Sequence, residues 1–212
     1  MYEDGGDLGH GDHFRGNRTM HVPLIVDAPA FFPQRLRVTG LVSTMDIAPT
    51  LEAIAGAEPG PGLAGVDLRV AARDGVSPHK DLVFETGLWF APVSTGYLEG
   101  RRIPYPDITE LGEIDFDAGT GISIKSEYFD ITNIAKHRML YTGRYKLLYL
   151  PTGRGIKWEL YDLLYDAGES MDISGESRAL TRRLARRLLD ALAAAPNTEI
   201  RNDFILPLEP AD

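Results

Sequence analysis

Two histidines and several carboxylates lie close together in a glycine-rich stretch near the start of the chain. Residues 2–16 read YEDGGDLGHGDHFRG, in which Gly9 and Gly11 flank His10, and His13 follows shortly after. Glycine of this density disfavours both helix and strand, and it lets the backbone approach an anion closely. An imidazole can donate a hydrogen bond or a proton near neutral pH. We therefore predict an active-site loop that contacts an anion, with His10 as its first candidate and His13 as a weaker second.

Other charged residues could complete such a site. Arg15 and Arg18 follow the histidines and could bind a charged substrate, although either could instead pair with the acidic loop. Asp7 and Asp12 could orient the imidazoles, or they could simply form turns. His137 lies much further along the chain, just before a predicted hairpin. It could reach the substrate pocket, or it could serve as a capping or surface residue.

The elements that must position this loop follow it directly. Residues 21–27 (HVPLIVD) form a short apolar run that predicts a buried strand anchoring the loop on a sheet. Residues 41–56 predict a helix that begins with Ser43 or Asp46 as a capping residue and ends at Gly56. The helix face expected to pack on the sheet carries Ile47, Leu51 and Ile54.

The rest of the chain predicts a second, smaller domain. A boundary near residue 75 separates residues 1–75, the end of an α/β domain, from residues 76–212. After a short strand, residues 88–136 show no sustained periodicity and predict a variable, substrate-facing segment. A small antiparallel sheet and a terminal helix complete the C-terminal subdomain. The predicted strand, hairpin, third strand and helix span 81–85, 138–150, 158–163 and 178–195.

Composition excludes some classes of partner. The chain has 22 Lys and Arg against 31 Asp and Glu, a formal charge of −9, which disfavours nucleic-acid and anionic-membrane partners. An arginine cluster at 178–187 is interpreted as the solvated face of the terminal helix. No apolar stretch is long enough to span a bilayer, and no secretion signal is visible. The compartment is not predicted, and a soluble, cytoplasmic protein is the default expectation.

Five segments, taken in order, resemble the C-terminal half of a sulfatase, a family of the alkaline-phosphatase-like superfamily of metal-dependent hydrolases. They are LGHGDHFRG (8–16), HVPLIV (21–26), VSTMDIAPTLEAIAG (42–56), TGRYKLLYL (142–150) and ELYDLLYDAGE (159–169). The resemblance covers residues 1–195 and is weakest over 90–135. It implies the C-terminal part of an alkaline-phosphatase-like α/β fold, followed by a small antiparallel sheet subdomain with a C-terminal helix.

Two of these segments carry charged residues to which the sequence assigns no chemistry. Tyr145 and Lys146 match a recurring family pattern, and we interpret them as strand packing with a lysine whose ammonium group reaches solvent. Asp166 to Glu169 (DAGE) stands where the family usually has Asp-Pro-Gly-Glu. Loss of the proline predicts a looser turn without loss of chemistry.

The resemblance also implies parts that this sequence does not contain. A sulfatase has two metal-binding aspartates after its first strand, a C/S-x-P-x-R motif whose Cys or Ser becomes formylglycine, and an Asp-His-Gly or Asp-Asn-Gly motif. The chain has no cysteine, and Ser77-Pro78-His79 is out of register with the nucleophile motif. We expect formylglycine to be absent here and a Ca²⁺ or Mg²⁺ ion to be held mostly by residues outside this chain. A truncated reading frame, an internal start or a subdomain, inactive alone, is expected.

The function that the resemblance implies is hydrolysis of sulfate esters. His10 stands where the family has the residue that contacts the sulfate group and assists the leaving group. Arg15, Arg18 and His137 are candidate substrate-binding residues, and the expected substrate is an ester of a small molecule or carbohydrate. A phosphomonoester, phosphodiester or phosphonate hydrolase of the same superfamily is one alternative, and a non-catalytic binding or structural module is another. The expected protein partner is the missing N-terminal part or a second copy of this chain.

Overall fold

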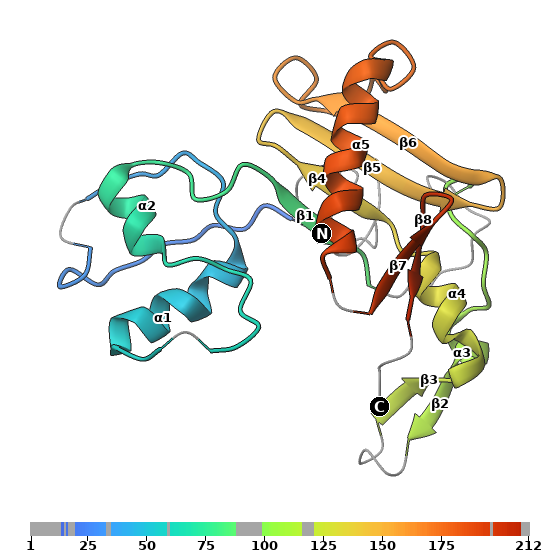
Figure 1. The fold of residues 1–212 in the computed structure, drawn as a ribbon, viewed down its shortest axis with the longest axis horizontal. Coiled ribbons are helices and arrows are strands. Elements are labelled where there is room, and N and C mark those ends of the chain that lie inside the picture. Colours follow the sequence, from blue (N-terminus) through green and yellow to red (C-terminus); the bar gives the residue numbers. More distant parts are fainter. Residues whose placement is uncertain are drawn as a thin grey trace. The chain divides into compact units, whose positions relative to one another are not determined.

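The computed structural model describes residues 14, 16, 20–32, 35–58, 60–87, 99–115, 121–195 and 197–208 (Figure 1). They belong to two units. One unit comprises Met1–Met20, Val83–Leu140 and Tyr145–Asp212, and the other comprises His21–Leu82 and Tyr141–Arg144. Of the described residues before His21, Phe14 and Gly16 accept or donate backbone hydrogen bonds to Lys146 and Glu169 of the first unit.

A four-stranded sheet forms the centre of the first unit. Its strand order is β1-β4-β5-β6. The strands are β1 (Leu82–Glu85), β4 (Arg138–Tyr141), β5 (Tyr145–Thr152) and β6 (Gly155–Asp162). Strands β5 and β6 are antiparallel, with Tyr145 opposite Asp162 and Thr152 opposite Gly155. Gly143 has a φ of 82° in the tight connection between β4 and β5. The predicted hairpin and the third strand beside it are confirmed.

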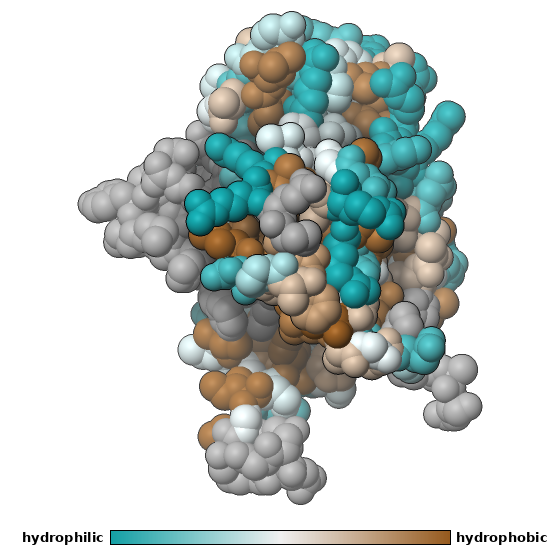
Figure 2. All heavy atoms as spheres, turned by 90° about the vertical axis from the view of Figure 1, so that its left-hand side faces the viewer, coloured by the Kyte–Doolittle hydropathy of each residue, from teal (hydrophilic) through white to brown (hydrophobic). Residues whose placement is uncertain are grey.

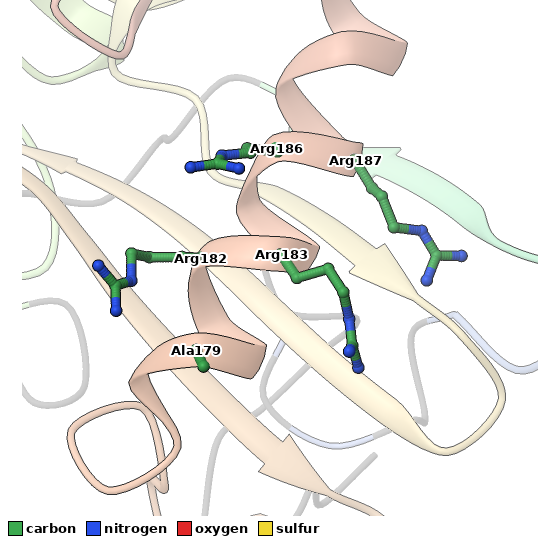
Figure 3. A pocket seen from close by; sticks show the side chains of 5 residues that line it. All are labelled: Ala179, Arg182, Arg183, Arg186 and Arg187. Atoms are coloured by element: carbon green, nitrogen blue, oxygen red, sulfur yellow. The ribbon is translucent and has the colours of Figure 1, made fainter.

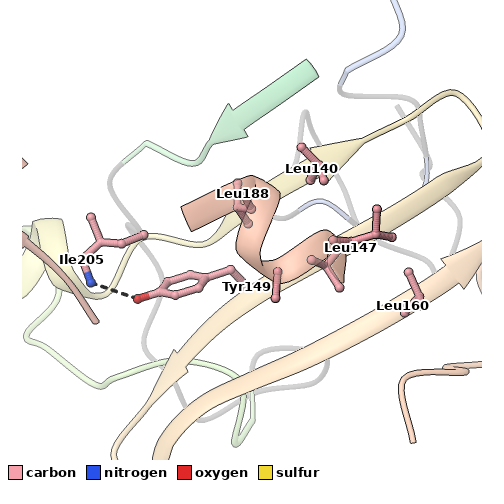
Figure 4. Packing of buried hydrophobic residues seen from close by; sticks show 8 residues of the cluster. Leu140, Leu147, Tyr149, Leu160, Leu188 and Ile205 are labelled. Carbon is pink, nitrogen blue, oxygen red and sulfur yellow. Dashed lines mark hydrogen bonds between the residues drawn. The ribbon is translucent and has the colours of Figure 1, made fainter. Parts of the chain in front are cut away.

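Helix α5 (Arg178–Ala193) packs across one face of this sheet (Figures 1 and 4). The buried side chains of this core include Leu140, Leu147, Tyr149, Leu160, Leu184, Leu188 and Ile205. The predicted terminal helix is therefore confirmed. Within the core, the Tyr149 hydroxyl accepts a hydrogen bond from the Ile205 backbone N–H at 3.2 Å (Figure 4). Burial raises the pKa of Tyr149 to about 12.

A short hairpin follows α5 and contributes Ile205 to this core. Strands β7 (Thr198–Arg201) and β8 (Phe204–Pro207) are antiparallel, and Asn202 and Asp203 connect them. Both connecting residues have positive φ, 52° and 64°, as a two-residue hairpin turn requires. This hairpin was not predicted from the sequence, although Asn-Asp is a recognisable turn pattern.

The segment interpreted as irregular, residues 88–136, contains regular elements in its described parts. Helices α3 and α4 flank the antiparallel hairpin β2–β3. The bounds are α3 (Ile108–Leu111), β2 (Gly112–Asp115), β3 (Gly121–Ile124), η3 (Ser126–Tyr128) and α4 (Phe129–Ile134). Each element is short, which explains why no sustained periodicity is visible in the sequence.

The second unit contains the predicted helix of residues 41–56 in two parts. They are η1 (Thr44–Asp46) and α1 (Ile47–Ala55), and α2 (Leu68–Asp74) follows. Ser43 caps η1: its hydroxyl accepts from the Met45 N–H at 3.2 Å, and the Asp46 carboxylate accepts from the Ser43 N–H at 2.8 Å. Gly56 ends α1 with a φ of 69°. The predicted caps are confirmed.

Two packing expectations for this unit are not met. Residues 21–27 form no strand, and Ile25 is 89% exposed. Of the apolar residues expected to face a sheet, Ile47 and Leu51 of α1 are exposed, while Pro49 and Thr50 are buried. A strand needs a neighbour to satisfy its backbone, and no strand of the described residues pairs with 21–27. Figure 2 shows hydrophobic side chains reaching the molecular surface in several places.

Candidate functional site

The sheet of the first unit has a second buried face, opposite α5, that carries charged side chains. Successive residues of a strand point to opposite faces. Because Leu147 and Leu160 pack in the α5 core, Lys146 of β5 and Glu159 of β6 point to the other face. Lys146 lies opposite Tyr161 in the register, which places all three polar side chains together on this face. We call it the charged face of the sheet.

Lys146 is fully buried on the charged face and makes three hydrogen bonds. Its ammonium nitrogen donates to the backbone carbonyls of Phe14, at 2.6 Å, and Gly16, at 2.8 Å. The third bond goes to the Glu169 carboxylate at 2.5 Å. An ammonium group has three donors, so every one is used. Burial lowers the pKa of Lys146, and the Glu169 carboxylate offsets part of that effect.

Glu169 completes the attachment from the turn that follows β6. Its side chain is 1% exposed, and its second oxygen accepts from the Gly16 backbone N–H at 3.0 Å. The Asp166 carboxylate holds this turn by accepting from the N–H groups of Ser170, at 3.0 Å, and Met171, at 2.8 Å. Glu169 itself has a φ of 54°, a left-handed conformation that costs free energy in a residue other than glycine. The turn thus aims a carboxylate at Gly16.

These contacts fix the end of the predicted active-site loop. Phe14, which follows His13 directly, is buried, and its ring lies edge-on to Phe84 of β1 with ring centres 6.4 Å apart. The predicted site residues His10, His13, Arg15 and Arg18 lie outside the described residues. The structure therefore gives the attachment point of the loop and not the positions of these side chains.

A second polar cluster on the charged face surrounds Glu159. Its carboxylate accepts from Arg101 Nε at 2.9 Å, Lys157 Nζ at 2.6 Å and the Tyr161 hydroxyl at 2.9 Å. Burial raises the pKa of Glu159, but the hydrogen bonds from Lys157, Arg101 and Tyr161 outweigh it and hold the pKa below its ordinary value. Because Arg101 lies within the predicted substrate-facing segment, this cluster fixes one end of the described part of that segment.

His137 holds the same end of the segment through its ring. The ring is buried, and Nε2 lies 2.7 Å from the Arg101 carbonyl oxygen. A carbonyl oxygen only accepts, so Nε2 is the donor. Thr86 fixes the backbone of His137: its hydroxyl accepts from the His137 N–H, and its own N–H donates to the His137 carbonyl, each at 3.0 Å. Among the sequence-predicted site residues, His137 is the one that the structure describes, and it contacts the chain itself.

The sequence analysis missed the residues that make the charged face. Lys146 was interpreted as a lysine whose ammonium group reaches solvent, and that interpretation is wrong because the group is buried and ion-paired. Glu159 and Glu169 received no role at all. A signal does exist for Lys146, which stands before the apolar run LLYL of its strand, and a charge in a doubly buried strand needs a partner.

A histidine–aspartate pair lies in the second unit. Asp46 is fully buried, and both of its carboxylate oxygens lie 2.9 Å from His79 Nε2. The same carboxylate accepts from the backbone N–H groups of Ser43 and Val66. These bonds tie the start of η1 to two later segments, which is a structural role. The sequence analysis assigned His79 no function. No group of three or more His, Asp or Glu side chains that could hold a metal ion occurs among the described residues.

Arginines of α5 line an open hollow on the opposite side of that helix from the sheet core. The hollow has a volume of about 530 Å³ and is lined by Ala179, Arg182, Arg183, Arg186 and Arg187 (Figure 3). The arginine side chains diverge from the helix into solvent, and all are exposed. This arrangement is that of a solvated helix face, as the sequence predicts.

Comparison with known proteins returns partial structural matches. No family model matches the sequence, and no curated protein matches it. The solved structures that it matches include the phosphonate monoester hydrolase of Silicibacter pomeroyi, with 15% identity over 82% of this chain and a TM-score of 0.47. They also include the phosphonate monoester hydrolase of Agrobacterium radiobacter, with 20% identity, 78% coverage and a TM-score of 0.43. A 2-O GAG sulfatase matches with 20% identity, 78% coverage and a TM-score of 0.36.

These matches are with the families that the sequence resembles, sulfatases and phosphonate monoester hydrolases. The chain spans 30%, 28% and 27% of the three matched chains, so it corresponds to a part of each of them. The described residues of this chain form antiparallel sheets and a C-terminal helix, a mixed α/β arrangement. Among the helices that the structure describes, none combines the length and the apolar character needed to cross a bilayer.

Proposed function

We propose that this chain is the C-terminal part of a sulfate-ester hydrolase and that it contributes the loop around His10 to the active site. The observation that carries the proposal is the attachment of Phe14 and Gly16. Two buried charges, Lys146 and Glu169, bind the backbone at the end of the loop. Burying charges is costly, and here the buried charges fix a glycine-rich segment. Such a segment is where a functional loop is expected.

Each predicted site residue has a role in this proposal. His10 contacts the sulfate group and delivers a proton or hydrogen bond to the leaving oxygen. His13 makes a second anion contact or orients His10, and Arg15 and Arg18 bind the charged substrate. His137, whose ring holds the Arg101 carbonyl, fixes the wall of the substrate site.

The nucleophile and the metal belong, in this proposal, to residues outside this chain. A bound Ca²⁺ or Mg²⁺ ion would neutralise charge on the transferring group. Among the described residues no set of three or more His, Asp or Glu side chains could hold this ion. In this proposal the chain binds the anion and protonates the leaving group. A sulfated or phosphorylated small molecule or carbohydrate is the substrate class.

The first test is the sequence encoded upstream of Met1 in the same frame. A C/S-x-P-x-R motif there supports a sulfatase, and a phosphohydrolase nucleophile in its place favours the phosphate or phosphonate alternative. If the frame contains neither, the chain is a non-catalytic module and the proposal fails.

The second test is turnover of an aryl sulfate by the protein that contains both parts. Replacing His10 with alanine should lower kcat by about 10²-fold or more, as loss of a general acid does. His21→Ala is the matched control, because His21 is exposed and lies just outside the loop. His79 is unsuitable as a control because its ring binds the buried Asp46. Equal effects of the His10 and His21 changes would contradict the role of His10.

A further inference from the structure

We propose that Lys146 and Glu169 are positioning residues that set the placement of the His10 loop. The pair acts on the loop through the backbone of Phe14 and Gly16, and it touches no substrate. The chemical role of the loop rests on the function proposed above, whereas the positioning itself can be measured without it.

The hydrogen-bond donors and acceptors of Lys146 and Glu169 match those of their partners in number. Lys146 has three N–H donors, and they meet two loop carbonyls and one Glu169 oxygen. Glu169 has two oxygens, and they meet Lys146 and the Gly16 N–H. Three bonds therefore connect the two side chains with two loop residues, a fourth joins the side chains to each other, and no donor of the ammonium group is left over. Fixing a backbone N–H and two carbonyls together defines the direction in which the chain leaves Phe14 toward His13.

The attachment of the loop and the direction of its backbone depend on different contacts. The Phe14 ring is buried on its own account and lies against Phe84, which supplies hydrophobic attachment. Hydrophobic contact is not directional, so the ring alone would let the backbone turn about it. The bonds from Lys146 and Glu169 are directional, and they end on backbone atoms of the loop. Weakening the pair should therefore loosen the loop while Phe14 and the sheet stay in place.

The turn that carries Glu169 holds this residue in the conformation that makes the contact. Glu169 adopts a left-handed φ of 54°, and the Asp166 carboxylate and carbonyl hold the turn around it. A residue with a Cβ is kept in that conformation only where the surroundings hold it there. The contact that this conformation delivers is the pair of bonds to Lys146 and Gly16.

Glu169→Gln is the test variant, and Glu159→Gln is its matched control. An amide at position 169 can still accept from Lys146, but its NH₂ group would face the Gly16 N–H, so the bond to the loop is lost. Glu159 is a carboxylate of similar burial on the same charged face, yet its bonds run to Arg101, Lys157 and Tyr161 instead of the loop. The control therefore reports general weakening of this face of the sheet.

The measurements are amide hydrogen exchange at Gly16 and native-state trypsin cleavage after Arg15 and Arg18 in the 212-residue chain. In Glu169→Gln, both rates should rise about tenfold, the effect of losing one hydrogen bond to a charged group. In Glu159→Gln, neither rate should change. Equal rates in Glu169→Gln and the unsubstituted chain, or equal increases in both variants, would overturn the proposal. If Glu169→Gln does not fold, Lys146→Met/Glu169→Leu, which buries no charge, replaces it with the same expected result.

Turnover by the protein containing both parts then separates this proposal from the proposed function. A positioning role predicts that Glu169→Gln lowers kcat and leaves KM nearly unchanged, with His21→Ala as control. If Glu169→Gln raises the exchange and cleavage rates while His10→Ala leaves turnover unchanged, the positioning role stands and the proposed function is contradicted. If His10→Ala lowers turnover while Glu169→Gln changes neither the exchange and cleavage rates nor kcat, only the positioning role is contradicted.

Discussion

A double-mutant cycle on Lys146 and Glu169 should reveal strong coupling between the two residues. Lys146→Met leaves the Glu169 carboxylate buried without its cation and leaves two carbonyls without a donor. Glu169→Leu leaves a buried ammonium group and an unpaired Gly16 N–H. Removing one partner of a buried pair typically costs about 3–5 kcal/mol of the free energy of unfolding.

The double variant Lys146→Met/Glu169→Leu buries no charge at these positions. It still leaves the Phe14 and Gly16 carbonyls and the Gly16 N–H without partners, and unpaired buried polar groups cost about 1–3 kcal/mol each. Adding the two single losses would give about 6–10 kcal/mol. At about 1 kcal/mol for each of these three groups, we expect the double variant to lose about 3 kcal/mol, and hence a coupling energy of about 3 kcal/mol or more.

Urea unfolding followed by the fluorescence of Trp158 measures this cycle. Trp158 lies in β6 and packs edge-on against Tyr149, with ring centres 5.4 Å apart, so its emission reports the sheet itself. A Trp89→Phe background makes Trp158 the only tryptophan of the chain. Additive single effects, or single losses below about 1 kcal/mol, would refute the view that the pair is buried and mutually dependent.

Three further predictions concern Glu159, Tyr149 and Ile25. Because hydrogen bonds hold the pKa of Glu159 below 4.5, its contribution is present above that pH and lost as the pH falls, so the urea midpoint should fall less steeply on acidification in Glu159→Gln. Tyr149→Phe removes the acceptor of the Ile205 N–H and should lower the free energy of unfolding by about 1–3 kcal/mol, while a loss under about 0.5 kcal/mol would contradict that bond. Ile25→Asp should reduce self-association and hydrophobic-dye binding without changing the urea midpoint, because Ile25 is exposed; unchanged association in light scattering would exclude this surface as its cause.

The elements predicted from the sequence are those whose patterns are local. The β4–β5 hairpin and α5 each carry a complete apolar period and a terminating residue within a few turns of chain, and both occur where expected. The cap of η1 by Ser43 and the end of α1 at Gly56 are local in the same sense. A local pattern needs no knowledge of what lies across the fold.

Residues 21–27 show where such reasoning stops. Apolar, β-branched composition indicates which side chains favour burial, but it does not state which strand would pair with them. In the described residues no strand does so, and Ile25 remains exposed. The pattern of the sequence does not predict α3, β2, β3 and α4 for a different reason: four to six residues are too few to display a period.

The candidate site was predicted from residue types near the start of the chain, and its side chains His10, His13, Arg15 and Arg18 stay a prediction. What the sequence could not supply was their attachment. Lys146 is 130 residues from Gly16, and Glu169 is 153 residues from it. Only the register of β5 and β6, together with the left-handed turn at Glu169, brings these groups to one place. Contacts at such separation depend on the whole fold being known.

The two faces of the central sheet are buried for different physical reasons. The α5 face holds leucines and Tyr149, whose contact surfaces are apolar and need no directional partner. The charged face covers backbone segments, Phe14 to Gly16 and the start of the Arg101 segment, whose carbonyl and N–H groups must be paired once water is excluded. Leucine at position 146 or 169 would fill the space but pair none of those groups. Lys146 and Glu169 pair those of Phe14 and Gly16, and His137 pairs the Arg101 carbonyl. Because these bonds are directional, the same residues that make burial possible also define where each segment runs.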